Sequence, residues 1–93
     1  MRYASAQVAL ELGSSNPSER WRAAQQAGEL PAADVIQALG RASARERVPW
    51  VLEAQVRALA ALADHPLDRG RRSPEDWAAL ARELRARLGV EEE

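Results

Sequence analysis

One histidine and thirteen basic residues, all of them arginine, are the side chains of this sequence best suited to chemistry. His65 follows Asp64 and lies close to Asp68, a set that could bind a metal or transfer a proton. A metal site needs three or four converging ligands, and the chain has neither a cysteine nor an H-E-x-x-H pair. Beside Pro66, His65 is more simply a residue that caps a helix end. We therefore expect no metal and no cofactor.

Nucleophilic and phosphate chemistry also lack their sequence signatures. A serine nucleophile needs a histidine and an acid, and no G-x-S-x-G turn is present. The five glycines are scattered and form no phosphate-binding loop. Glu53 and Glu83 fall on polar helix faces, so paired inward carboxylates are not expected either. The sequence predicts that the chain is not an enzyme.

The composition favours one small domain that covers residues 1–93, because a chain of this length forms one core and not two. Its formal net charge is -1, which supplies no global attraction to nucleic acid or to an anionic membrane. No stretch of about 20 apolar residues is present, and the start lacks the apolar region of a signal peptide. We expect no membrane association and a cytoplasmic location.

The hydrophobic pattern predicts an all-α fold of five helices, joined by short turns and packed in antiparallel pairs. Asn16 and Ser73 are good N-cap residues, and a proline follows each at the first helical position. The expected helices cover residues 3–12, 17–30, 31–44, 49–63 and 74–88, and residues 91–93 form an acidic, solvated tail. The helix at 49–63 is apolar on most sides, so we expect it to be the most buried.

Parts of the sequence resemble the HEAT repeat, in its short bacterial variety. Residues 20–30 (RWRAAQQAGEL) resemble the first-helix signature of that family, and residues 31–39 resemble its second helix. Residues 53–62 (EAQVRALAAL) resemble the first helix again, although the last helix does not follow the pattern and Asn16 replaces the usual aspartate. The resemblance implies a fragment of a HEAT-like α-α superhelix. A small helical bundle of other origin is the alternative.

The same resemblance implies a concave surface that is lined by the second helix of each pair. That surface would bring together Asp34, Gln37, Arg41 and Arg45 of the third helix with Arg82 and Arg85 of the fifth. Such a mostly basic groove could bind an acidic peptide or a phosphate backbone. The alternative is a solvated face, because the helix dipole by itself favours arginines near a helix end.

Three tryptophans lie near the starts of helices, and we expect them to be buried. Trp50 is expected to be the least accessible, because it lies on the most apolar helix. Trp21, which stands between Arg20 and Arg22, could instead be a partly exposed contact for a partner.

These features favour a non-catalytic protein–protein interaction module, such as an adaptor, a regulatory subunit or a small subunit. A protein partner would bind in the polar groove, with Trp21 as an aromatic anchor. Two alternatives stay open. One is nucleic-acid binding through the arginines, which predicts steep salt dependence and equal sensitivity to Arg41 and Arg82. The other is a structural subunit that forms a homo-oligomer.

Overall fold

The computed structural model describes residues 2–90; residues 1 and 91–93, and with them the expected acidic tail, lie outside the described part. It contains five helices: α1 (Arg2–Glu11), α2 (Pro17–Ala27), α3 (Ala33–Arg45), α4 (Pro49–Leu62) and α5 (Pro74–Leu88). Residues 2–90 form no strand. The predicted all-α fold of five helices is therefore confirmed.

Local capping explains where the helices begin. The Asn16 side chain accepts a hydrogen bond from the Ser18 N–H at 2.9 Å, and Ser73 and Asp76 cap α5 reciprocally at 3.1 and 3.2 Å. The two helices begin at the predicted residues, and α5 also ends where predicted. By contrast, α2 ends three residues early, because Glu29 and Leu30 donate to carbonyls three residues back in a turn.

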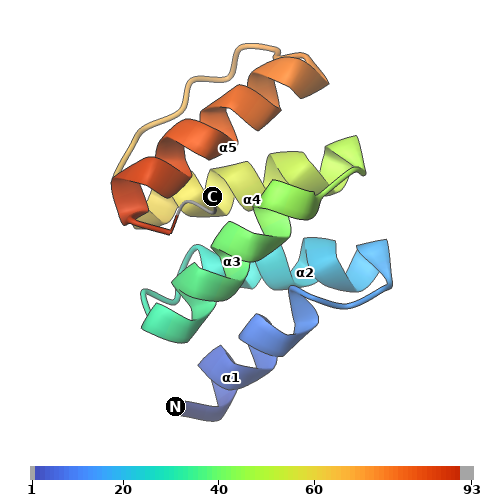
Figure 1. Ribbon diagram of the computed structural model, residues 1–93, viewed down its shortest axis with the longest axis vertical. Coiled ribbons are helices and arrows are strands. Elements are labelled where there is room, and N and C mark those ends of the chain that lie inside the picture. The colour runs from blue at the N-terminus through green and yellow to red at the C-terminus, as the bar shows by residue number, and fades with distance from the viewer. Residues whose placement is uncertain (1, 91–93) are drawn as a thin grey trace.

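The helices form two layers (Figure 1). One layer contains α1, α3 and α5, in which α3 packs between the other two, and the second contains α2 and α4. The contact between α2 and α4 is the most extensive in the fold. Small residues make it close: a Cβ added at Gly28 would lie 3.4 Å from the Ala58 Cα. Because α3 contacts all four other helices, its position is fixed from several sides.

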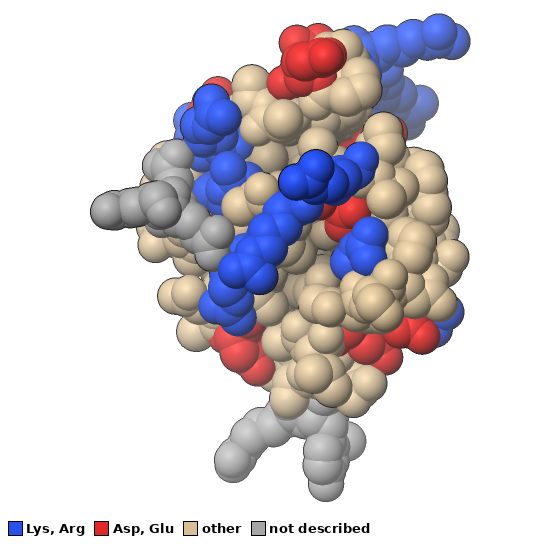
Figure 2. All heavy atoms as spheres, turned by 45° about the vertical axis from the view of Figure 1, so that its right-hand side comes forward, with Lys and Arg blue, Asp and Glu red and all other residues tan. Residues whose placement is uncertain are grey.

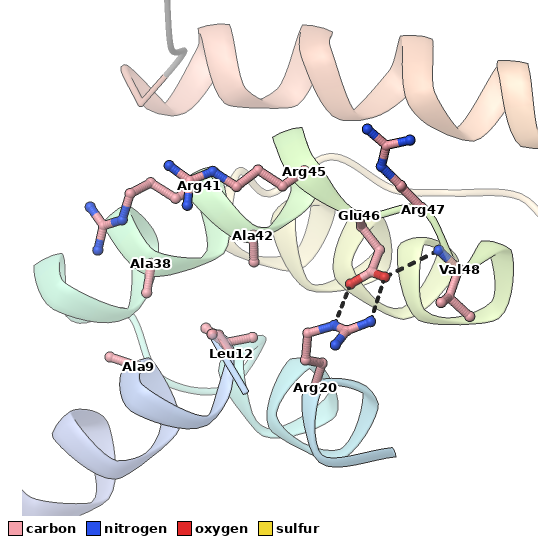
Figure 3. A pocket seen from close by; sticks show the side chains of 11 residues that line it. Ala9, Leu12, Arg20, Ala38, Arg41, Ala42, Arg45, Glu46, Arg47 and Val48 are labelled. Carbon is pink, nitrogen blue, oxygen red and sulfur yellow. Dashed lines mark hydrogen bonds and ion pairs between the residues drawn. The ribbon is translucent and has the colours of Figure 1, made fainter. Parts of the chain in front are cut away.

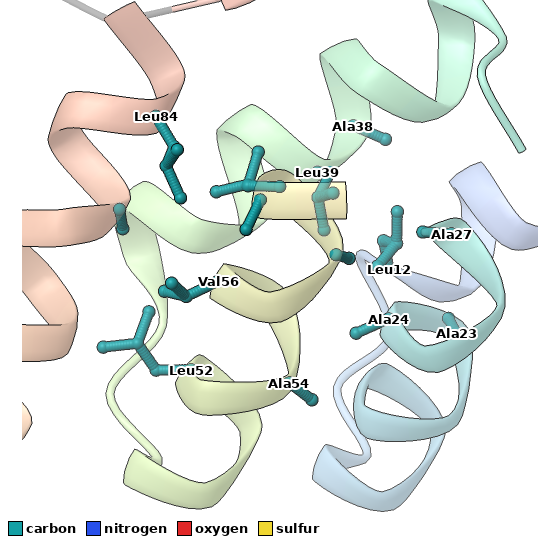
Figure 4. Close-up of a cluster of buried hydrophobic side chains, with 14 of the residues drawn as sticks. Leu12, Ala23, Ala24, Ala27, Ala38, Leu39, Leu52, Ala54, Val56 and Leu84 are labelled. Atoms are coloured by element: carbon teal, nitrogen blue, oxygen red, sulfur yellow. The ribbon is translucent and has the colours of Figure 1, made fainter. Parts of the chain in front are cut away.

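The core is built from large aliphatic side chains of α1 and its end, α3, α4 and α5, and from alanines of α2. Four leucines are fully buried: Leu12 directly after α1, Leu39 on α3, Leu59 on α4 and Leu84 on α5. From α2 the core receives alanines alone (Figure 4), namely Ala23, Ala24 and Ala27. This packing keeps the two layers close together.

Within residues 2–90, no helix combines the length and the apolarity that crossing a bilayer requires.

Candidate functional site

A buried ion pair fixes the end of α3 and the link that follows it. The Arg20 guanidinium at the start of α2 donates from Nε and Nη2 to both carboxylate oxygens of Glu46, at 2.8 and 2.9 Å. Glu46 also accepts from the Gln55 amide of α4 at 3.0 Å and from the Val48 N–H at 3.2 Å. Arg20 donates further to the Ser14 carbonyl at 2.9 Å. One carboxylate thus joins α2, α4 and the α3–α4 link.

The charge of this carboxylate is stabilised although its side chain is only 2% exposed. Burial by itself raises the pKa of Glu46. The hydrogen bonds from Arg20, Val48 and Gln55, together with the charge of Arg20, outweigh burial and bring the pKa below its ordinary value. The hydrogen bond between Arg20 and Glu46 also raises the pKa of Arg20. Glu46 is therefore ionised at neutral pH and neutralises Arg20.

Beside this ion pair lies a hollow of about 380 Å³. Its floor is apolar and comes from α1 and α3: Ala9, Leu12, Ala38 and Ala42. Its rim carries Arg41, Arg45 and Arg47, which we call the arginine ridge. In Figure 3, Arg41 and Arg45 extend along α3, Glu46 turns inward to Arg20, and Arg47 points away from the Glu46 carboxylate. Basic side chains form a band across this side of the molecule (Figure 2).

The arginine ridge is not neutralised from within the described chain. Within residues 2–90, Arg41, Arg45 and Arg47 form no ion pair, and Glu46, the one carboxylate that lines the hollow, is already paired with Arg20. The rim therefore carries three positive charges around an apolar floor. Guanidinium groups bind carboxylates and phosphates through paired hydrogen bonds. The hollow therefore presents cationic groups next to an apolar surface.

The structure brings together only part of the groove that the sequence predicts. Asp34 and Gln37 are exposed on α3 but do not line the hollow, and Asp34 instead accepts from the Ser5 hydroxyl of α1 at 3.4 Å. Arg82 is exposed on α5 and also lies outside the hollow lining. Of the six residues that the sequence assigned to the groove, Arg41 and Arg45 line the observed hollow.

The prediction that Arg85 lies on an open groove face is wrong. Its side chain is buried between α5 and α3, where Nη1 donates to the Ser43 hydroxyl at 3.1 Å. The reason is that α5 packs directly on α3, so the arginine stem fills the contact and its head reaches a polar partner. Arg85 therefore holds α5 to α3 and does not present its guanidinium to a partner on an open surface.

The tryptophans also differ from the prediction. Trp50, expected to be the least accessible, is 49% exposed, and Trp21 is 39% exposed. Both line a groove of about 620 Å³ between α2 and α4, separate from the arginine hollow. Trp77 alone is buried, and the guanidinium groups of Arg57 and Arg72 lie over its ring at 5.3 and 5.1 Å. Trp21 is thus accessible, but it cannot anchor a ligand in the hollow.

His65 makes a structural contact. Its Nδ1 lies 3.2 Å from Nη1 of Arg87, and its backbone N–H bonds the Ala60 carbonyl at the end of α4. In the part of the chain that the structure describes, no three His, Asp or Glu side chains converge closely enough to hold a metal ion.

Sequence reasoning missed Glu46, Gln55 and Arg47. Glu46 and Arg47 fall in the link between the helices predicted at 31–44 and 49–63, and Gln55 is a polar residue in the most apolar helix. A fully buried glutamine in such a helix needs a polar partner, which was the one available signal. The partner itself lies outside the helix and could not be named.

Comparison of this chain with protein families, with curated proteins and with solved structures gives no match. The function proposed below therefore rests on the site itself.

Proposed function

We propose that this protein is a non-catalytic interaction module that binds an acidic segment of a partner protein at the arginine ridge. The observation that carries the proposal is that Arg41, Arg45 and Arg47 surround an apolar floor without a neutralising partner in residues 2–90. Carboxylates of the partner would pair with the guanidinium groups, and an apolar side chain would cover the floor. The proposed binding site is therefore smaller than the polar groove expected from the sequence and lies at the end of α3.

The test uses a fluorescein-labelled peptide of six glutamates around one leucine, followed by fluorescence anisotropy. Arg41→Gln and Arg45→Gln should each weaken binding about tenfold, since a charge-assisted hydrogen bond contributes about 1.5 kcal/mol. Arg82→Gln is the matched control, because Arg82 is exposed but lies outside the hollow. Equal weakening by all three substitutions would show a diffuse charge effect and would contradict the proposal.

Nucleic-acid binding is the second candidate, because the guanidinium groups of the ridge, which form no ion pair within residues 2–90, also suit phosphates. Its signature is a steep loss of affinity with salt and equal sensitivity to Arg41 and Arg82. The same anisotropy assay with a labelled single-stranded DNA distinguishes the candidates. Tighter binding of the DNA than of the peptide, together with a loss in Arg82→Gln, would favour the nucleic-acid function.

Self-association is a third candidate, favoured by the exposed Trp21 and Trp50 on the α2–α4 groove. Large exposed aromatic side chains often mark contact surfaces. Sedimentation velocity over a hundredfold concentration range tests it. A concentration-dependent increase in mass that Trp50→Ala abolishes would support a homo-oligomer, and a constant monomer would exclude one.

We also propose that α2–α3 and α4–α5 are two HEAT-like helical pairs. The support is that α2 packs on α4 and α3 on α5, as successive pairs do in a stacked array. Duplicating residues 17–48 within the chain should then give a longer, cooperatively folded protein with a higher Tm. A duplicated chain that loses cooperative unfolding would contradict this proposal.

A further inference from the structure

We propose that the groove between α2 and α4 is a second binding site, which takes a basic segment of a partner protein at Trp21, Trp50 and Glu29. The groove is separate from the arginine hollow, so this site goes beyond the function proposed for the arginine ridge. Two exposed indole rings, a floor of small residues and a net negative charge support it.

Two tryptophans leave apolar surface uncovered at one end of the groove. The helices α2 and α4 lie side by side and run in the same direction (Figure 1), and Trp21 and Trp50 lie near their starts. These tryptophans are 39% and 49% exposed, and within residues 2–90 no guanidinium lies over either ring. Tryptophan is enriched among the residues that contribute most to protein interfaces. The two rings therefore offer contact surface to a partner.

The floor of the groove leaves room for the side chains of a docked segment. It consists of small residues, among them Ala24 and Gly28 of α2 and its end, and Ala54 and Ala58 of α4. The space above them is about 620 Å³, which falls within the range of about 300–1,000 Å³ that is typical of ligand-binding clefts. A partner segment can therefore lie along the groove while its side chains pack against the alanines.

The charged groups of the groove attract a cation. Glu29 and Glu53 line it together with a single guanidinium, that of Arg57, which leaves one net negative charge at neutral pH. Arg57 is already engaged, because it donates to Glu53 at 3.0 and 3.2 Å and lies 5.3 Å over the ring of Trp77. Glu29 is exposed and forms no ion pair within residues 2–90. A lysine or arginine of the partner can therefore pair with Glu29 and lie over an indole face, as Arg57 lies over Trp77.

A second copy of this chain fits the groove less well than a basic segment does. In a twofold dimer the same surface lies on both sides of the interface. Glu29 and Glu53 would then face the groove of the other copy, which has the same negative charge, and like charges across an interface lower affinity. The charges therefore favour a partner of opposite sign.

The first experiment uses a fluorescein-labelled peptide of six lysines around one leucine, the charge-reversed form of the acidic peptide, in the anisotropy assay. Trp50→Ala should weaken its binding about tenfold and Glu29→Gln about threefold. Leu10→Ala on α1 and Glu83→Gln on α5 are the matched controls, because both residues are exposed outside the groove, and neither should change the affinity. Absence of binding, or equal weakening by Glu29→Gln and Glu83→Gln, would overturn the proposal.

Arg41→Gln separates this site from the arginine ridge. It should weaken binding of the acidic peptide and leave binding of the lysine–leucine peptide as tight as in the unaltered chain. The function proposed for the ridge can therefore fail while the groove site stands, and the reverse also holds. Weaker binding of the lysine–leucine peptide to Arg41→Gln would contradict the groove as its site.

The second experiment identifies the covered surface by NMR. The unlabelled lysine–leucine peptide should shift the indole N–H resonances of Trp21 and Trp50, and should shift that of the buried Trp77 much less. Equal shifts of all three resonances would overturn the proposal, since the peptide would then act on the fold as a whole. Sedimentation velocity of the free protein tests the other occupant. A dimer that Trp50→Ala dissociates would assign the groove to a second copy and would also overturn the proposal.

Discussion

Arg20 and Glu46 are 26 residues apart in the chain, yet two N–H groups of the guanidinium meet both oxygens of the carboxylate at 2.8 and 2.9 Å. This pair lies under the arginine ridge and joins the start of α2 to the end of α3. The arginines that line this hollow therefore fall into two groups, one paired within the protein and one that forms no ion pair within the described chain. Arg20 is paired with Glu46, whereas Arg41, Arg45 and Arg47 form no ion pair within residues 2–90.

The first prediction concerns the stability that this pair supplies. Glu46→Gln should lower the free energy of unfolding by about 2 kcal/mol, because it leaves Arg20 without its counter-charge in a largely buried position. Urea unfolding followed by circular dichroism measures the loss. Glu53→Gln is the control, since its pair with Arg57 is about half exposed and should contribute less than about 0.5 kcal/mol. Similar losses in the two variants would show that the buried pair has no special weight.

The second prediction concerns acid. The pKa of Glu46 is lower in the folded protein than in the unfolded chain, where it is about 4.3. Its contribution to stability is therefore complete above about pH 4.3 and is lost as the pH falls through the lowered pKa of the folded state. Tm measured from pH 7 to pH 2.5 should fall less in Glu46→Gln than in the unaltered chain. Parallel curves would mean that other carboxylates cause the acid sensitivity.

The third prediction compares two glycines. Gly40→Ala places a methyl group 2.8–3.1 Å from Val90, including the Val90 carbonyl oxygen, so the chain after α5 must shift and stability should fall by about 1–2 kcal/mol. Gly28→Ala meets α4 at ordinary contact distances of 3.4–3.8 Å in a right-handed conformation. It should be neutral or stabilise by up to about 1 kcal/mol. Thermal unfolding measures both, and a reversed order would mean that Val90 is not seated on α3.

The fourth prediction concerns the tryptophans. Trp77→Ala should cost about 3 kcal/mol, because it empties a buried site between α4 and α5 and removes the ring under Arg57 and Arg72. Trp50→Ala should cost less than about 1 kcal/mol, since the side chain is 49% exposed. Urea unfolding by circular dichroism compares the two variants. A larger loss for Trp50→Ala would indicate that its exposed ring is buried in a homo-oligomer.

Local signals predicted the helices well where they act over a few residues. Ser73 and Pro74 set the start of α5, and Gly89 sets its end, so both bounds agree with the sequence. The predicted end of α2 at residue 30 is wrong, because the helix ends at Ala27 and the chain leaves it through Gly28 and a turn.

The site could be predicted only in part, because its missing members depend on contacts between helices. The pattern of α4 is apolar on most sides, so it does not tell which side meets solvent, and Trp50 was assigned to the wrong one. The direction in which Arg85 points depends on how α5 lies on α3. The spacing on α3 places Arg41 and Arg45 on one polar face together with Asp34 and Gln37, so it does not tell which members of that face line the hollow.

Under the proposed function, the hydrogen bonds on the Glu46 carboxylate also lower the entropic cost of binding a ligand. They hold the backbone that carries the ridge before any ligand arrives, so association restricts little beyond the arginine side chains, at about 2 kcal/mol or less each. Because the binding site is already folded, no slow folding step has to precede ligand binding. An acidic ligand should therefore associate in a single fast phase, with a rate constant of about 10⁷ M⁻¹ s⁻¹ that falls as salt screens the three guanidinium charges.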